Sequence, residues 1–333
     1  MKRLTLLKKW VKFQLPMKEA TLHPITADAS FRKYYRVFDE NGDSLIVMDA
    51  PPQTENCDAF IKVANLMRRA GLNVPKILAQ NTIDGFLIIT DLGKHTYLEH
   101  LNEDNANELF LDAIASLIKL QVASKAGEIP VYSSRVLRSE LDLFPTWFLG
   151  EHLKLSLPEN QKHELEKTFS FLIKTANAQQ KVFVHRDYMP RNLIVSQPNP
   201  GIIDFQDALM GPITYDIVSL LKDAFISWPE EKIDLWIRTY WEQAKQISLP
   251  VEDDFKLFRK QVELMGLQRH LKVIGIFARI NYRDGKPNYM RDTPRFLKYV
   301  LDVSKNHREL FWLHKLVDQV MNKNCKPSTN AKN

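Results

Sequence analysis

The sequence has 333 residues, of which 44% are hydrophobic and 26% are charged, and these proportions are ordinary for a globular protein. They exclude a fibrous or a disordered chain, and the length predicts one large or two modest domains. The formal net charge is +6, but the basic residues are dispersed along the chain. Dispersed charge favours a solvated surface over a nucleic-acid-binding patch.

Cysteine usage and the N-terminus indicate the compartment. Cys57 and Cys325 lie far apart and match no zinc or redox spacing, which favours a reducing environment. The first 16 residues include apolar side chains, but lysines interrupt them and no cleavage site follows. No run elsewhere approaches the roughly 18 uncharged apolar residues of a membrane span. We therefore expect a cytoplasmic protein that binds neither membranes nor nucleic acids; whether it has protein partners stays unknown.

Residues 1–92 are rich in strand patterns. Short β-branched or aromatic runs occupy residues 22–25, 34–38, 45–48 and 86–90, and Asn41-Gly42-Asp43 marks a turn. Between the last two runs, apolar residues of the segment 56–70 recur with a helical period, and Gly71 offers a C-terminal stop. The predicted order is three strands, a helix, and one or more further strands.

Residues 93–323 show a different pattern. Segments 109–122 and 162–176 predict helices, and residues 233–320 are almost wholly helical in pattern, with a break near 284–287. Only residues 182–184, 193–195 and 201–203 resemble strands there, and residues 324–333 predict a disordered tail. We therefore predict an α+β fold with a small β-rich N-terminal lobe and a large helical C-terminal lobe.

One stretch, residues 183–207, carries chemical information. His185-Arg186-Asp187 is followed five residues later by Asn192, and Asp204 comes after a hairpin-length gap. This is the spacing of a kinase catalytic loop and its metal-binding aspartate. A triplet such as His-Arg-Asp occurs by chance and then marks a loop surface; the full set of spacings favours the kinase.

The chemistry of phosphoryl transfer explains these residue types. Asp187 would orient an attacking hydroxyl and accept its proton. Asn192 and Asp204 offer the hard oxygen ligands that suit Mg²⁺, which also binds phosphate oxygens. The motif therefore predicts a kinase that uses ATP and Mg²⁺, with Asp187 as the catalytic residue.

These residues resemble the aminoglycoside phosphotransferase superfamily, and the resemblance implies its bilobal protein-kinase-like fold. It also implies that residues 1–92 clamp the nucleotide, and that Asp216, after Tyr215, braces the catalytic loop. Within the superfamily the chain is similar to the bacterial anomeric kinases of N-acetylmuramate and N-acetylglucosamine, which act in peptidoglycan recycling. The segments that carry this likeness are residues 28–32, 47–52, 91–93, 184–193, 204–223 and 265–279. The likeness implies phosphorylation of the C1 hydroxyl of an N-acetylated amino sugar.

The nucleotide-binding end departs from the protein-kinase pattern. Residues 26–32 stand in place of a glycine-rich loop, and Met48 stands where a third-strand lysine is expected. Arg32 is our first candidate for the missing cation and Lys33 the second; the alternative is a solvated hairpin. The predicted nucleotide-binding residues are Asp28, Ser30, Phe31 and Arg32 in the loop, and Thr90, Asp91 and Leu92 at the hinge.

The acceptor site is expected in the C-terminal lobe. A lactyl carboxylate would favour an arginine that forms two parallel hydrogen bonds, and Arg269 and Arg279 are candidates. The other predicted substrate-binding residues are His185, Arg191, Gln206 and Asp207, although His185 is also a candidate support of the catalytic loop.

Two rival functions stay open. One is a kinase for an aminoglycoside, choline or homoserine; an aminoglycoside pocket should be lined with carboxylates, because its substrate is polycationic. The other is a non-catalytic pseudokinase scaffold, which is supported only by the missing lysine and glycines.

Overall fold

The computed structural model describes residues 2–15, 21–25 and 31–324, and the chain divides into two compact units. The first unit comprises Met1–Ala123 and His185–Ala208, and the second comprises Ser124–Val184 and Leu209–Asn333. The predicted lobe boundary between residues 92 and 93 falls inside the first unit, so the division into functional lobes stays a prediction. The predicted tail lies, except for residue 324, outside the described residues.

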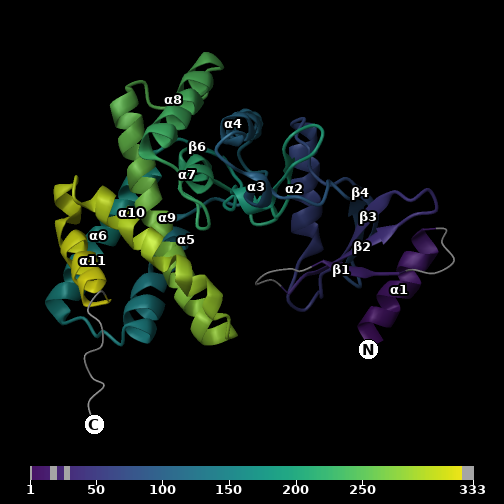
Figure 1. Ribbon diagram of the computed structural model, residues 1–333, viewed down its shortest axis with the longest axis horizontal. Helices are drawn as coiled ribbons and strands as arrows, with labels where there is room; N and C mark the ends of the chain where they lie inside the picture. Colours follow the sequence, from purple (N-terminus) through teal and green to yellow (C-terminus); the bar gives the residue numbers. More distant parts are fainter. Residues whose placement is uncertain (1, 16–20, 26–30, 325–333) are drawn as a thin grey trace, which may run out of the picture. The chain divides into compact units, whose positions relative to one another are not determined.

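The first unit is built on a five-stranded antiparallel sheet in the order β1-β2-β3-β5-β4 (Figure 1). Its strands are β1 (His23–Ile25), β2 (Lys33–Phe38), β3 (Ser44–Asp49), β4 (Ile77–Asn81) and β5 (Phe86–Thr90). Gly42 lies in the β2–β3 turn with φ at +85°, a conformation that glycine adopts without a steric penalty. All four predicted strands are present. The additional strand β4 carries Gln80 and Asn81, which have weak β-propensity.

Helix α1 (Lys2–Gln14) packs on one face of this sheet (Figure 1). Its apolar residues Leu7 and Val11 are buried together with Val37, Val47, Phe86 and Ile88 of the strands. Arg3 adds polar contacts, because its Nε donates to Asp49 Oδ1 at 2.7 Å and its guanidinium lies 4.8 Å from the Phe86 ring centroid. The N-terminal amphipathic segment therefore docks on the chain's own sheet.

Helix α2 (Cys57–Arg69) shows why the local sequence predicted it well. The Asn56 side chain caps its start by accepting from the backbone N–H of Asp58 at 2.7 Å. Gly71 follows its end with φ at +75°, as a C-terminal stop requires. The remaining elements of this unit are α3 (Tyr97–His100), α4 (Ala106–Val122), the 3₁₀ turn Pro190–Asn192, and the short strands β7 (Leu193–Ile194) and β8 (Gly201–Ile202).

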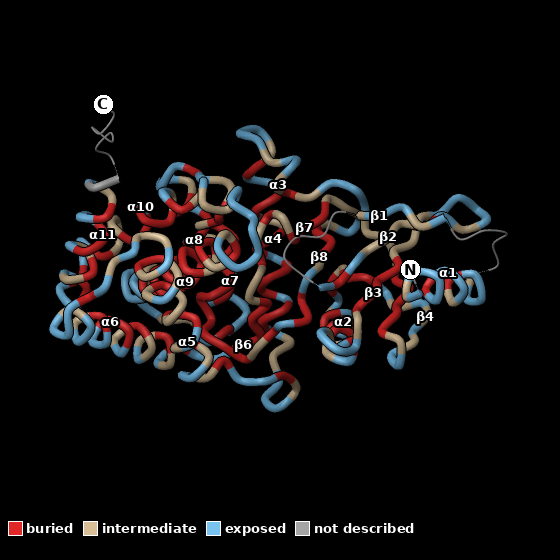
Figure 2. The backbone as a smooth tube through the Cα atoms, turned by 90° about the horizontal axis from the view of Figure 1, so that it is seen from below, coloured by how far each residue is buried: buried red, intermediate tan, exposed pale blue. Residues whose placement is uncertain are grey.

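The second unit is helical apart from one two-stranded ladder. Strands β6 (Lys181–Val184) and β9 (Leu209–Pro212) form that ladder. The helices are α5 (Ser134–Leu141), α6 (Glu159–Ala178), α7 (Tyr215–Leu221), α8 (Glu230–Gln246), α9 (Phe255–Asp284), α10 (Thr293–Ser304) and α11 (Phe311–Asn324), with a π-helical segment at Phe144–His152 and 3₁₀ turns at Pro287–Asp292 and Arg308–Leu310. Helix α9 is buried along most of its length (Figure 2). It ends at Gly285, whose φ of +67° marks the predicted break.

A buried polar network joins α5, α7 and α9. Lys272 Nζ lies 2.9 Å from Glu140 Oε1 and donates to the Tyr215 hydroxyl at 2.9 Å. Gln268 Nε2 donates to Glu140 Oε2 at 3.2 Å, and the Tyr132 hydroxyl bonds to the same oxygen. Because both charged groups are less than a tenth exposed, loss of either would leave an uncompensated buried charge.

Gly275 marks a close approach inside the second unit. A Cβ at this position would lie 2.4 Å from the backbone carbonyl carbon of Leu143, just before the π-helical segment. No side chain fits there, so glycine allows α9 to cross this segment closely. The sequence pattern did not predict the π-helix.

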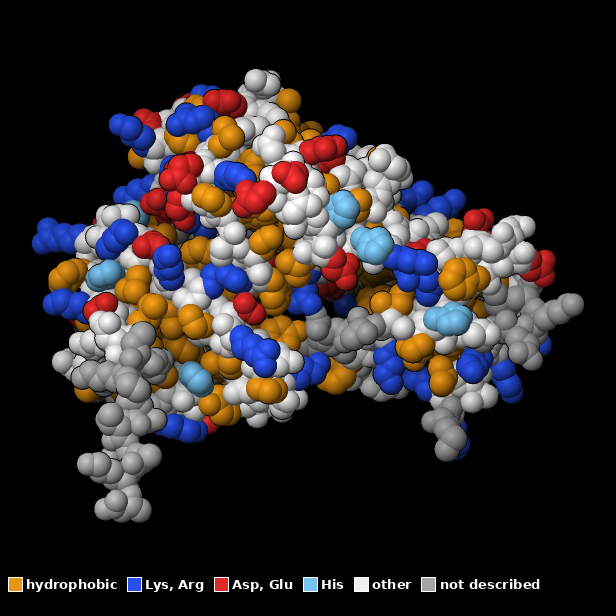
Figure 3. All heavy atoms as spheres, viewed as in Figure 1, with side chains coloured by type: hydrophobic (Ala, Val, Ile, Leu, Met, Phe, Trp, Pro, Cys, Tyr) orange, Lys and Arg blue, Asp and Glu red, His pale blue; other side chains and the backbone are white. Residues whose placement is uncertain are grey.

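The surface charges and the helices can be compared with the predictions of no nucleic-acid-binding patch and no membrane span. On the face drawn in Figure 3, lysine and arginine side chains are scattered among acidic and hydrophobic ones. None of the helices in residues 2–15, 21–25 and 31–324 is both long enough and apolar enough to span a bilayer.

The docking of α1 is testable with a matched pair of leucines. Leu7→Ala should lower the free energy of unfolding by about 2 to 5 kcal/mol, because Leu7 is fully buried. Leu6 is 43% exposed, and Leu6→Ala should change it by less than about 0.5 kcal/mol. Urea denaturation measures both values; equal losses would contradict the packing described.

Candidate active site

The predicted catalytic residues Asp187, Asn192 and Asp204 lie in the first unit, in a loop that is held by hydrogen bonds to its backbone. The Asn192 side-chain amide donates to the backbone carbonyl of Asp187 at 2.9 Å. The backbone N–H of Ile203 donates to the Asn192 carbonyl at 3.1 Å, one residue before Asp204. The loop therefore holds Asp187, Asn192 and Asp204 in one bonded frame.

His185 fastens this frame from inside the protein. It is completely buried, its Nε2 lies 3.1 Å from the carbonyl oxygen of Ile203, and its Nδ1 accepts from the backbone N–H of Asp187 at 3.3 Å. These contacts define a neutral imidazole that donates from Nε2 and accepts at Nδ1. Burial lowers the pKa of His185 to about 4, which keeps the ring neutral at physiological pH. The prediction that His185 binds substrate is corrected: it positions Asp187.

The carboxylate of Asp204 reaches solvent but is only partly surrounded by water. Its side chain is exposed, but neighbouring protein atoms limit the hydration of the carboxylate. This desolvation, followed by the negative charge of Asp187, raises the pKa of Asp204. Gln206 Nε2 donates to Asp204 Oδ1 at 2.9 Å and opposes the shift. Asp187 and Asp204 are therefore close enough to repel each other, and a cation bound there would relieve the repulsion.

The residues present fit a magnesium ion. The Asn192 amide nitrogen is used by the Asp187 carbonyl, which leaves the amide oxygen as a ligand. Asp204 contributes carboxylate oxygens that Gln206 only partly occupies. Mg²⁺ usually keeps several waters and takes only one or two protein carboxylates together with phosphate oxygens. The described residues contain no group of three or more His, Cys, Asp or Glu that would form a complete protein cage.

Two residues of this loop have left-handed backbones. Arg186 has φ at +77° and Asp204 has φ at +62°. Non-glycine residues in this region cost about 1–3 kcal/mol each and cluster at functional sites. Arg186 Nη1 donates to the backbone carbonyl of Asp207 at 3.4 Å, which ties Arg186 to the segment just after Asp204.

The predicted phosphate-contacting residues differ in their placement. Asp28 and Ser30 lie outside the described residues, and Phe31 is 68% exposed. Arg32 is buried and its Nη2 lies 2.6 Å from Glu55 Oε2. Of the two described residues in this group, Arg32 is therefore the one that a charged partner holds in position.

The predicted hinge is fixed by its side chains. Arg36 bonds to both carboxylate oxygens of Asp91, at 2.5 and 3.2 Å, and Gly93 N–H donates to Asp91 Oδ1 at 3.0 Å. Burial would raise the pKa of Asp91, but the Arg36 and Gly93 bonds hold it below its usual range. Thr90 Oγ1 accepts from Lys76 N–H at 2.9 Å. These side chains fix the backbone on either side of Leu92, and nucleotide binding at this hinge stays a prediction.

Three other predicted residues remain to be placed. Asp207 is exposed and Arg191 partly buried in the first unit, and their substrate contacts stay predictions. Asp216 is completely buried in α7 of the second unit, and its role as a structural brace stays a prediction.

The predicted acceptor arginines both lie on α9 in the second unit but differ in environment. Arg269 is 3% exposed and near Asp223; burial raises the pKa of Asp223 and the charge of Arg269 opposes this. Arg279 is half-buried, and its Nε has no hydrogen-bond partner among the described residues. Burial, and then the charge of Arg283, lower the pKa of Arg279. Arg279 is thus the less neutralised of the two.

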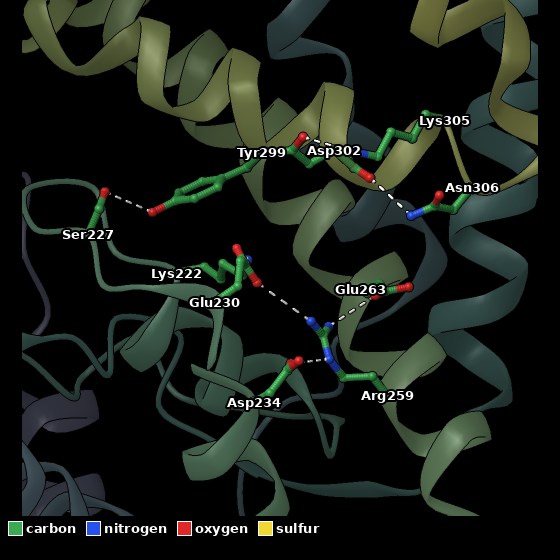
Figure 4. Close-up of polar contacts among 10 residues, drawn as sticks. All are labelled: Lys222, Ser227, Glu230, Asp234, Arg259, Glu263, Tyr299, Asp302, Lys305 and Asn306. Atoms are coloured by element: carbon green, nitrogen blue, oxygen red, sulfur yellow. Dashed lines mark hydrogen bonds and ion pairs between the residues drawn. The ribbon is translucent and has the colours of Figure 1, made fainter. Parts of the chain in front are cut away.

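The loop after α7 is held by charged and aromatic contacts (Figure 4). Lys222 pairs with Glu230, and the hydroxyls of Ser227 and Tyr299 lie 3.0 Å apart. Arg259 lies 3.7 Å from Glu230, and it bonds Asp234 at 2.8 Å and Glu263 at 3.2 Å. These contacts fix the loop that carries Asp223.

Comparison with known proteins identifies the family. The model of the phosphotransferase enzyme family matches residues 21–254, which include the catalytic loop and the sheet. The chain belongs to this family.

Relatives of this phosphotransferase support the same assignment. An N-acetylmuramate/N-acetylglucosamine kinase of Pseudomonas aeruginosa is 50% identical over 299 residues, covering 90% of this chain and 88% of the relative. The enzyme of the same name from Neisseria meningitidis serogroup B is 42% identical, covering 96% and 97%. The structure of a choline kinase from Streptococcus pneumoniae superposes with a TM-score of 0.64 at 15% identity, covering 88% of this chain and 98% of that one. The predicted protein-kinase-like fold is confirmed.

Three residues of this phosphotransferase were not singled out as supports of the site. Gln206 was predicted to bind substrate, but its amide is 8% exposed and orients Asp204. Glu55 holds Arg32, and the Tyr188 hydroxyl donates to the carbonyl of Ala113 at 2.8 Å to anchor the catalytic loop on α4. Only Gln206 had a sequence signal, its place directly after Asp204-Phe205.

The buried His185 predicts a pH-dependent stability. Its folded pKa of about 4 lies below the ordinary value of 6.5, so the unfolded chain takes up the proton first as the pH falls. The contribution of the neutral His185 to the free energy of unfolding is fully present above about pH 6.5 and is lost progressively down to about pH 4. Between pH 7.5 and 5 this loss is about 2 kcal/mol. Urea denaturation of wild type and His185→Gln at both pH values should show a shallower decline in the variant.

A surface histidine provides the control. His163 is exposed on α6, so His163→Gln removes no buried imidazole. The free energy of unfolding of this variant should fall between pH 7.5 and 5 by as much as that of the wild type. If His185→Gln and wild type declined equally, His185 would not be the neutral support described.

Proposed function

We propose that the protein transfers the γ-phosphoryl group of ATP to the C1 hydroxyl of N-acetylmuramate and N-acetylglucosamine. The product, a sugar 1-phosphate, would serve nucleotide-sugar synthesis during peptidoglycan recycling in the cytoplasm, where ATP is available. The observation that carries this proposal is the bonded frame of Asp187, Asn192 and Asp204 in a chain that is 50% identical to a kinase of that name.

The proposed reaction needs few groups. Asp187 accepts a hydrogen bond from the sugar C1 hydroxyl and takes its proton as the new oxygen–phosphorus bond forms and the bond to the β-phosphate oxygen breaks. Asn192 and Asp204 would hold a magnesium ion, which would neutralise charge on the phosphate oxygens. Gln206 and His185 keep the ligand and the base in position, so little reorganisation is needed at the moment of transfer.

The acceptor carboxylate distinguishes the two sugars, because N-acetylmuramate carries a lactyl group and N-acetylglucosamine does not. Arg279 is the better candidate for this carboxylate. The buried Arg269 already compensates Asp223, whereas Arg279 is partly accessible and its neighbour Arg283 is bonded to Asp284 at 2.7 Å. A partly accessible arginine can form the two parallel hydrogen bonds that a carboxylate favours.

The rival functions have weaker support. The choline kinase likeness is at 15% identity and supports the fold only. An aminoglycoside site would need an acidic lining, whereas both acceptor candidates on α9 are cations. A pseudokinase scaffold would have no need for a base and two metal ligands held by side-chain bonds.

The first test measures magnesium-dependent ADP release with N-acetylmuramate, N-acetylglucosamine and kanamycin as acceptors. Turnover is expected on both acetylated sugars and absent on kanamycin. Asp187→Asn should lower kcat by about 10²- to 10⁴-fold while ATP binding persists. Near-normal turnover by this variant would contradict the mechanism, and turnover on kanamycin alone would contradict the sugar assignment.

The second test compares two conservative changes on α9. Arg279→Lys should raise KM for N-acetylmuramate about tenfold relative to KM for N-acetylglucosamine, because lysine cannot form the paired hydrogen bonds. Arg269→Lys should lower the thermal stability and change both KM values equally. The ratio of the two KM values is insensitive to the fraction folded. An unchanged ratio in Arg279→Lys would exclude this arginine as the carboxylate contact.

A further inference from the structure

The sheet of the first unit has one face covered by α1 and an opposite face that carries both polar and apolar side chains. Val37 and Val47 point toward α1. Because side chains alternate along a strand, Tyr34, Arg36 and Met48 point to the opposite face. Tyr34 and Met48 are direct cross-strand partners, so their side chains are neighbours. The position expected for a phosphate-contacting lysine therefore adjoins Tyr34.

A guanidinium occupies this neighbourhood. Arg32 lies two residues before Tyr34 and hydrogen-bonds to its hydroxyl. Arg32 Nη2 also lies 2.6 Å from Glu55 Oε2, and both side chains are only about a tenth exposed, at 10% and 12%. Glu55 lies two residues before the first residue of α2, so the ion pair joins the entry of β2 to the segment that leads into the helix.

The same group lies beside the metal-binding aspartate. Burial raises the pKa of Tyr34, and after burial the largest cause is the charge of Asp204; the charge of Arg32 acts in the opposite sense. The ring of Phe205, the next residue, packs at a tilt against Phe60 of α2, with the ring centroids 4.8 Å apart. Arg32, Tyr34 and Asp204 thus converge on one place, with α2 packed against it.

We infer that Arg32, held by Glu55 and Tyr34, replaces the third-strand lysine as the cation that contacts the nucleotide phosphates. In protein kinases that lysine pairs with a glutamate of the following helix. Here the cation comes from β2, one strand away, and its acidic partner comes from the residues before α2. Glu55 and Tyr34 are positioning residues that act through Arg32. The inference rests on the proposed use of a nucleotide, but not on the identity of the sugar.

The chemistry of arginine suits it to replace the third-strand lysine. An arginine side chain is long and presents a planar fork of donors, so it can bond Glu55 with one edge and a phosphate with another. A lysine placed on β3 would instead extend from the buried position of Met48, which is 0% exposed. Without Glu55, the guanidinium would lose the partner that fixes its direction.

The test measures binding of Mg²⁺-ADP and of adenosine, which lacks phosphates, by calorimetry with no sugar present. Arg32→Lys and Glu55→Gln should each weaken ADP binding about tenfold, the loss expected for one charge-assisted hydrogen bond, and change adenosine binding less than about twofold. The double variant should bind ADP no more weakly than Arg32→Lys alone, because both changes remove one interaction. Tyr34→Phe should weaken ADP binding by a smaller factor.

Arg36 provides the matched control, because it lies on the same face of β2 but bonds the hinge residue Asp91. Arg36→Lys should weaken ADP and adenosine in parallel. Parallel losses of both ligands in Arg32→Lys and Glu55→Gln, or additive losses in the double variant, would overturn the inference. If the variants weaken ADP binding but not adenosine binding, and the wild type turns over no sugar, only the proposed acceptor would be overturned.

Discussion

The active site depends on the two hydrogen bonds of one buried imidazole. His185 connects the backbone of Asp187 to the carbonyl that precedes Asp204, so the proposed base and the proposed metal ligand cannot move apart without breaking a buried bond. A buried polar group without a partner costs about 1–3 kcal/mol, which makes this connection stiff. The low pKa of His185 follows from the same burial, and the neutral ring is the only protonation state that both accepts and donates here.

The catalytic loop is also where backbone strain is concentrated, and the surrounding bonds explain how it persists. Arg186 and Asp204 have left-handed backbones on either side of the hairpin. Side-chain bonds from Asn192 and Gln206 hold the strained loop, and both of these side chains are less than a tenth exposed. Strain of this kind persists only where neighbouring structure over-determines the conformation. The result is that the side chain of Asp204 is exposed to solvent although its backbone is held in one conformation.

Much of this arrangement could be predicted because local signals agree with the final fold. The cap at Asn56, the stop at Gly71 and the break at Gly285 are local effects, and each is present. The spacing of Asp187, Asn192 and Asp204 is local too. What the sequence could not provide are contacts between distant segments: Glu55 with Arg32, or Gly275 against Leu143. The π-helix was also missed, and the residue before it, Leu143, packs against the distant Gly275 of α9.

The distribution of cations shows why a motif search alone would leave this site incomplete. Phosphoryl transfer needs positive charge near the nucleotide, but an arginine can also serve only to hold a structural carboxylate. Arg36 is such a case, because Asp91 takes two of its donors. Arg32 also has a carboxylate partner, but its position beside Tyr34 and Asp204 places that ion pair at the proposed metal site. The location of a pair relative to the chemistry, rather than its existence, therefore separates a cation that shapes the fold from one that serves the reaction.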